Sequence, residues 1–187
     1  MPVLPVLGLV LAYVATIPLA NWMVQHVGTV CQADGPCLLP VWPGILAPSG
    51  VALAGLALVL RDLVQRRAGL VWSLAAIGVG VAVSALVAPP ALVAGSAMAF
   101  LVSELADAAV YTPLQRRGLV VAVLASSAVG AVVDSLVFLR LAFGSLDHLD
   151  GQIIGKFWAI AAAVGVIALV RRREANDPQH LATRISR

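Results

Sequence analysis

Residues 119–143 read LVVAVLASSAVGAVVDSLVFLRLAF, a run in which Asp134 and Arg140 are the only charged side chains. A helix rises about 1.5 Å per residue, so a run of this length crosses a bilayer core of roughly 30 Å. The whole chain is 61% hydrophobic and only 11% charged, which is outside the usual composition of soluble domains. The run therefore predicts a membrane helix, and the composition predicts an integral membrane protein.

The rest of the chain divides into similar apolar segments. We expect an all-α protein with six transmembrane helices, at approximately residues 3–25, 45–61, 70–88, 91–112, 119–143 and 153–170. The first segment lacks a basic stretch before it and a cleavage site after it, so we interpret it as a retained helix. The second segment is interrupted by prolines. Its outer half is either broken helix at membrane depth, as in transporter binding sites, or a loop before a helix that begins at Pro48.

The basic residues indicate the orientation of these helices. Ten of the twelve Lys and Arg residues follow the second, fourth and sixth segments, and the intervening connections contain none. By the positive-inside rule, both termini are expected in the cytoplasm of a multi-pass protein of the cell membrane. The same distribution argues against nucleic acid as a partner. Residues 1–170 are then the transmembrane domain, and residues 171–187 a polar cytoplasmic tail that contacts anionic lipid.

Two cysteines, Cys31 and Cys37, lie in the first outer connection. An oxidising exterior permits a disulfide between them, but five intervening residues do not guarantee its geometry, so two free thiols are an equal alternative. Metal-ligand spacing is not recognisable near them, and no cofactor is expected.

Polar side chains recur on one face of several predicted helices, at the spacing of helical turns. One such stripe runs through Phe100, Ser103, Glu104, Asp107 and Tyr111, and a second through Ser127, Gly130, Asp134 and Phe138. The sixth segment opens with Gln152 and Lys156. A charge at mid-depth in a membrane costs about 3 kcal/mol on insertion scales, so the charged residues among these are expected to line a solute route.

Structural pairing is the simpler alternative for the same residues. Asp134 could pair with Lys156 or Arg140 merely to hold helices together, although desolvation offsets much of the energy of a buried pair. Asp62, beside Arg61, fits either an interfacial ion pair or a gate. An enzyme is not expected, because no histidine lies in a helix core to activate the serines, and a glycine-rich phosphate loop is absent.

Several runs, taken in order, resemble one known family. They are AN at 20–21, APSGVALAGLALVLRDLVQRRAG at 47–69, SELADAAVYTPLQRR at 103–117, SSAVGAVVDSLVF at 126–138 and QIIGKFW at 152–158. Together they resemble the VUT family of queuosine precursor transporters. The resemblance implies uptake of a 7-deazaguanine and a fold akin to the substrate-binding subunits of energy-coupling-factor vitamin transporters.

The resemblance also implies a set of site residues, namely Asn21, Asp62, Glu104, Asp107, Asp134 and Lys156. A carboxylate can accept the N1 proton and the 2-amino group of a guanine-like ring together, a role for which Glu104 or Asp107 is the candidate. Stacking on the ring is expected from one of the aromatic side chains Phe100, Tyr111 and Phe138. Asp62 and Arg140 are candidates for gating or coupling.

Two positions depart from the family's pattern. Glu104 stands where a glutamine is frequent, and Ala131 where an asparagine is frequent, so the resemblance does not predict which deazaguanine is preferred. The main rival function is a non-transporting membrane scaffold whose buried charges pair with a partner's helices. The sequence leaves open the mode of energy coupling, an energising partner and assembly into a homo-oligomer.

Overall fold

The structure is a computed structural model that describes residues 3–33, 35–114 and 119–175. It contains mainly helices, with one small antiparallel sheet of strand order β1-β2-β3. In chain order the elements are α1 Val3–His26, β1 Val30–Cys31, β2 Cys37–Trp42, β3 Ile45–Pro48, α2 Val51–Ala68, α3 Leu70–Ser84, α4 Pro90–Leu114, α5 Leu119–Phe143 and α6 Leu149–Ala175.

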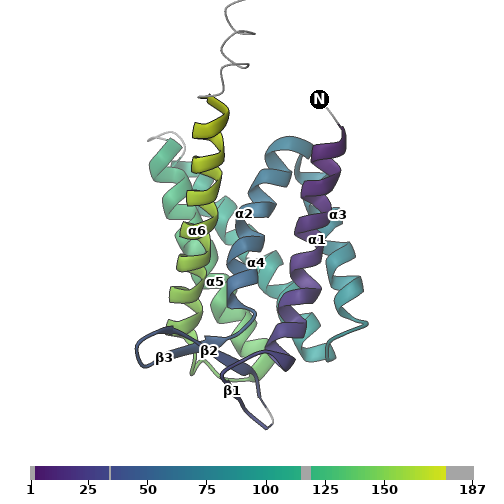
Figure 1. The fold of residues 1–187 in the computed structure, drawn as a ribbon, viewed down its shortest axis with the longest axis vertical. Helices are drawn as coiled ribbons and strands as arrows, with labels where there is room; N and C mark the ends of the chain where they lie inside the picture. The colour runs from purple at the N-terminus through teal and green to yellow at the C-terminus, as the bar shows by residue number, and fades with distance from the viewer. Residues whose placement is uncertain (1–2, 34, 115–118, 176–187) are drawn as a thin grey trace, which may run out of the picture.

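The helices run roughly side by side, and the sheet covers one end of them (Figure 1). We call this the sheet end. The N-terminus of α1 and the last turns of α6 lie at the opposite end. A buried apolar cluster built on Tyr13, Ile17, Ala57, Val64 and Phe100 holds α1, α2 and α4 together. Inside a membrane such a cluster stabilises the bundle through van der Waals packing, and here it fixes the helices that carry the polar groups.

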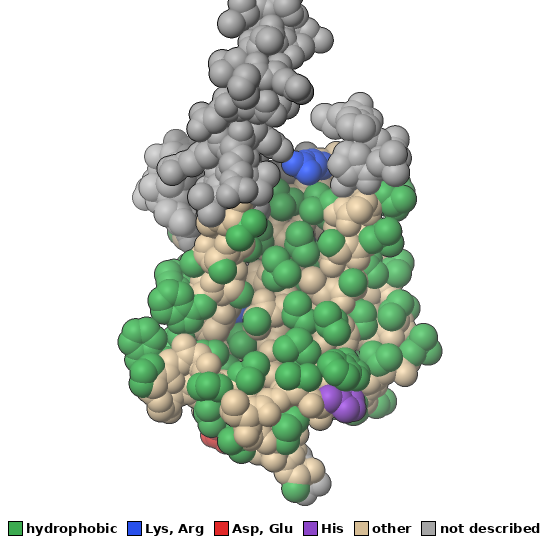
Figure 2. Space-filling model, in the orientation of Figure 1, with side chains coloured by type: hydrophobic (Ala, Val, Ile, Leu, Met, Phe, Trp, Pro, Cys, Tyr) green, Lys and Arg blue, Asp and Glu red, His purple; other side chains and the backbone are tan. Residues whose placement is uncertain are grey.

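The outer surface of the bundle is apolar. Figure 2 shows hydrophobic side chains over most of the visible face, with basic side chains at the end away from the sheet. Within the described residues, three helical stretches are long and apolar enough to cross a membrane, at Val6–His26, Pro90–Asp107 and Ala125–Phe143. These features agree with a membrane protein whose helices face lipid.

The second helix begins at Val51, close to the Pro48 start of one of the two alternatives. The all-α prediction holds for most of the described residues, but it missed the small sheet that stands in place of the expected outer loop. Residues 45–48 form β3, which pairs with β2, and α2 begins only at Val51. The physical reason is the turn between the strands, where Gly44 has a φ of +78° after Pro43. Proline followed by a glycine of positive φ reverses the chain within two residues, so the apolar residues on either side pair as strands.

The other helices lie close to their predicted positions. The fifth helix spans the predicted residues 119–143, whereas α2 continues to Ala68 and α6 to Ala175, beyond the predicted ends at 61 and 170. Arg61 therefore lies inside a helix and is buried, not in a cytoplasmic connection as expected. The tail after residue 175 lies outside the described residues, so the predicted domain boundary stays a prediction.

A disulfide joins Cys31 to Cys37, which decides between the two alternatives that the sequence left open. It ties β1 to β2, and the Ser49 hydroxyl donates a hydrogen bond of 2.7 Å to the Met23 carbonyl, which attaches the sheet to α1. The rings of Trp42 and Trp158 stack at 6.3 Å and attach the sheet to α6. The sheet is thus fixed to the helices on both sides.

Candidate functional site

A cavity lies inside the bundle near the sheet end, among α1, α2, α4, α5 and α6. About 460 Å³ within it is not filled by protein atoms, including the part that is open to solvent. We call it the first cavity. Its polar lining consists of Thr16, Asn21, Ser96, Asp134, Gln152 and Lys156, and its aromatic lining of Phe100 and Phe138. Five of the predicted site residues, Asn21, Phe100, Asp134, Phe138 and Lys156, therefore meet at one place.

An ion pair forms one wall of the first cavity. Lys156 Nζ lies 2.5 Å from Asp134 Oδ2 and donates a second hydrogen bond of 2.7 Å to Ser135 Oγ. The lysine is 1% exposed and the aspartate 6%. An ammonium has three donors, so these two bonds leave one for a ligand. Because the charges cancel, the pair adds no net charge to the cavity.

A neutral hydrogen-bond network forms the wall opposite α5 and α6. Asn21 on α1 donates from Nδ2 to Ser84 Oγ on α3 at 3.3 Å. Its Oδ1 accepts a hydrogen bond of 2.8 Å from Ser96 Oγ on α4. Buried amides are seldom left unpaired, because each lost hydrogen bond costs about 1–3 kcal/mol. The network therefore fixes the Asn21 amide between three helices.

Gln152 differs from Asn21 because its carbonyl oxygen is buried without a hydrogen bond. The side chain is 2% exposed, and no donor within the described part of the chain reaches Oε1. Gln152 lines the first cavity one turn before Lys156. A buried acceptor without a donor is unfavourable in the empty protein, and a ligand N–H that enters the cavity removes that penalty.

The rest of the first cavity's lining is apolar. Gly50, which immediately precedes α2, and Ala54 and Ala57 within it recur at turn spacing, so this helix presents almost no side-chain volume to the cavity. Phe100 and Phe138 come from α4 and α5. Phe100 is held edge-on by Tyr13, with ring centroids 6.5 Å apart. Small residues on one helix and aromatic rings on others leave a space suited to a planar molecule.

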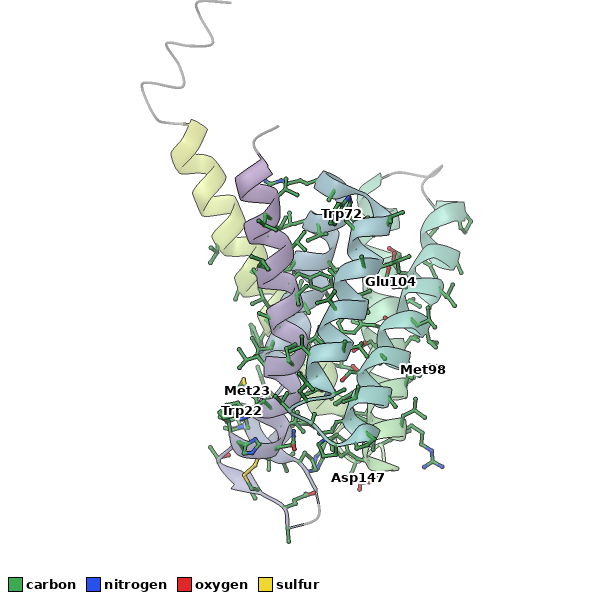
Figure 3. All side chains as sticks on the ribbon, turned by 90° about the vertical axis from the view of Figure 1, so that its right-hand side faces the viewer. Trp22, Met23, Trp72, Met98, Glu104 and Asp147 are labelled. Atoms are coloured by element: carbon green, nitrogen blue, oxygen red, sulfur yellow. A yellow bond between two sulfur atoms is a disulfide. The ribbon has the colours of Figure 1, made fainter. Side chains whose placement is uncertain are left out.

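Glu104 and Asp107 do not line the first cavity. Glu104 is bound by Arg61 of α2, whose Nη1 lies 2.7 Å from each carboxylate oxygen, and the two side chains are 17% and 9% exposed. Asp107 lines a second cavity with Arg61, Ser103, Ser127, Gly130 and Ala131. Figure 3 shows Glu104 well away from the sheet end, where Asp147 lies. The two acids thus belong to a separate polar region of the bundle.

The other predicted site residues are placed as follows. Arg140 is exposed and donates a hydrogen bond to the Gly144 carbonyl at the end of α5, and it is not among the residues that line either cavity. The side chains of Asp62 and Tyr111 lie outside the described residues. No cluster of three or more candidate metal ligands occurs in the described part of the chain.

Three polar residues of the first cavity were missed as site residues, namely Thr16, Ser96 and Gln152. Gln152 had a usable signal, because it lies one turn from Lys156 in the same segment. Ser96 had none, since a single serine in an apolar helix usually bonds to its own backbone. Its hydrogen bond to Asn21 spans 75 positions of the chain, a contact that no local pattern reveals.

Comparison with known proteins gives one match. Residues 50–170 match the family described as "Putative vitamin uptake transporter". The matched region covers α2 to α6 down to residue 170, and so contains Asp134, Gln152, Lys156 and the whole second cavity. No curated protein and no solved structure matches the chain.

Proposed function

The chain belongs to this vitamin uptake transporter family, and from that premise we propose that it imports a queuosine precursor, a 7-deazaguanine, through the first cavity. A transporter family agrees with the expectation that the chain is not an enzyme. The observation that carries the substrate proposal is the first cavity itself. It places an unpaired amide oxygen and a charge-balanced ion pair beside aromatic rings and the small residues of α2.

The hydrogen-bonding edge of a guanine-like ring presents one acceptor, O6, and two donors, N1–H and the 2-amino group. In the proposed complex, the remaining donor of Lys156 binds O6. Gln152 Oε1 accepts from the N1–H and 2-amino edge, while Phe100 or Phe138 stacks on the ring. This assignment differs from the expectation that Glu104 or Asp107 accepts these two donors, because neither residue lines the first cavity.

The lining of the first cavity has no net charge, which favours an uncharged base as its ligand. Asp134 and Lys156 are its charged lining residues in the described part of the chain, and they neutralise each other. A ring bearing a cationic aminomethyl group would bring a second ammonium near Lys156, where like charges repel in a low dielectric. Among queuosine precursors, 7-cyano-7-deazaguanine is therefore the preferred candidate.

The proposal includes an orientation and a fold. Six helices cross the cell membrane with both termini in the cytoplasm, and the fold is akin to the substrate-binding subunits of energy-coupling-factor vitamin transporters. The N-terminus and the last turns of α6 lie at the same end of the bundle, as this orientation requires. The sheet end then faces outward, where the Cys31–Cys37 disulfide is stable. A non-transporting scaffold explains neither the family nor the cavity.

Gln152→Leu gives a direct test of the proposed binding site. We expect the free protein to gain about 1 kcal/mol of stability, because a buried acceptor without a donor is removed. The affinity for 7-cyano-7-deazaguanine should fall by about tenfold, because the ligand loses its acceptor. Calorimetric titration and thermal unfolding of the purified protein measure the two effects. Unchanged affinity would exclude Gln152 from the site, and no binding by the parent would refute the substrate.

A further inference from the structure

The second cavity lies next to the first and is lined by α2, α4, α5 and α6, which also line the first. On α4 the lining passes from Phe100 to Ser103, and on α5 from Asp134 to Ala131 and Gly130. On α6 it passes from Lys156 to Ile160. Each step is about one helical turn, or roughly 5 Å along the axis. The two cavities are thus stacked, and the second lies farther from the sheet end.

Phe100 and the Asp134–Lys156 pair lie at the boundary between the cavities. Phe100 is buried, and its backbone carbonyl accepts a hydrogen bond of 3.0 Å from Ser103 Oγ, a residue of the second cavity. Asp134 is held by Lys156 from the neighbouring helix. A solute that leaves the first cavity in the direction away from the sheet meets the second cavity next.

The second cavity has its own recognition chemistry. Asp107 is half-buried in its wall and makes no hydrogen bond or ion pair within the described residues. Arg61 lies in the same wall and binds Glu104. A carboxylate can accept two neighbouring N–H groups, and a guanidinium can donate to a carbonyl oxygen. Asp107 and Arg61 together therefore complement the same edge of the base, with its two donors and one acceptor, that is proposed to bind in the first cavity.

We propose that the second cavity is a second binding station for the imported base, occupied after the first cavity and before release at the end away from the sheet. The proposal rests on the proposed function, because it names a second site for the same planar, uncharged ring. Asp107 accepts the N1–H and 2-amino donors in this station. The Arg61–Glu104 pair positions the guanidinium beside it. The base thus exchanges one carboxylate-bearing site for another about one turn away.

A variant that fills the second cavity with a larger side chain can show whether this cavity is needed for transport but not for binding in the first cavity. Ala131 lines this cavity, and Ala131→Leu adds three carbon atoms there without touching the first cavity's lining. The matched control is Ala128→Leu, the same change on an exposed face of α5. We expect Ala131→Leu to bind 7-cyano-7-deazaguanine with the parent's Kd, because the first cavity is intact. Its uptake into cells should fall by about tenfold or more, while Ala128→Leu should match the parent in both assays.

A second variant tests the chemistry without changing the volume. Asp107→Asn should likewise keep the parent's Kd for the first cavity, which Asp107 does not line, and lose uptake, because an amide can accept only through its oxygen. Uptake by Ala131→Leu at the rate of Ala128→Leu would overturn the proposal. Equal loss of binding and uptake in both Ala131→Leu and Asp107→Asn would also overturn it, because the cavities would then form one site. Absence of binding by the parent would refute the proposed function instead.

Discussion

Lys156→Met is expected to lower the free energy of unfolding by about 3–5 kcal/mol, because it leaves the buried carboxylate of Asp134 without its counter-charge. Lys156 is 1% exposed and Asp134 6%, so bulk water does not solvate the carboxylate as it would at the surface. Thermal or denaturant unfolding of the purified protein, followed by tryptophan fluorescence, measures the loss. Ligand binding should be lost as well, since Lys156 lines the first cavity.

The double variant Asp134→Asn with Lys156→Met distinguishes the structural role of this pair from its role in binding. Replacing both members of a buried pair by neutral groups is often nearly neutral for stability, so the double variant should unfold like the parent. It should still fail to bind a 7-deazaguanine. Recovery of both stability and binding would show that the pair only holds α5 and α6 together, as the structural alternative predicts.

Gly151→Ala is expected to cost about 2–3 kcal/mol of stability, because the added methyl group has no room between α6 and the sheet. A Cβ at this position would overlap the backbone carbonyl oxygen of Leu46 in β3 and approach Ala47 at 3.0 Å. Backbone cannot move aside as a side chain can, so the sheet must shift away from α6. The same unfolding assay measures the effect.

Gly165→Ala is the matched control on the same helix. A Cβ there meets nothing within 4 Å, and alanine favours helix over glycine by about 0.5–1 kcal/mol, so a small gain is expected. Equal effects of the two substitutions would contradict the close packing of the sheet on α6.

The helices of this fold could be predicted because each is set by its own sequence. The segment 119–143 is mostly apolar and lacks proline, so its bounds were predicted correctly. The sheet could not be predicted in the same way. CLLPVW and ILAP are apolar runs beside a membrane segment, and only their pairing with each other, reinforced by the disulfide, distinguishes them from it.

The candidate site could be predicted only in part. Asp134 and Lys156 are charges in apolar helices, and their need for partners brings them together whatever the rest of the packing. The Arg61–Glu104 pair was missed because Arg61 follows an apolar run and resembles a cytoplasmic anchor. Only the three-dimensional structure shows that α2 continues to Ala68 and that Arg61 is buried against Glu104 of α4.

Uptake of a 7-deazaguanine through the first cavity can be measured in living cells. Bacterial cells that neither synthesise nor import the base are given this chain and nanomolar 7-cyano-7-deazaguanine, and queuosine in their transfer RNA is assayed. We predict that the parent restores queuosine and that the double variant Asp134→Asn with Lys156→Met, present in the membrane at the same level, does not. No queuosine with the parent in the membrane, or equal restoration by the double variant, would contradict the claim.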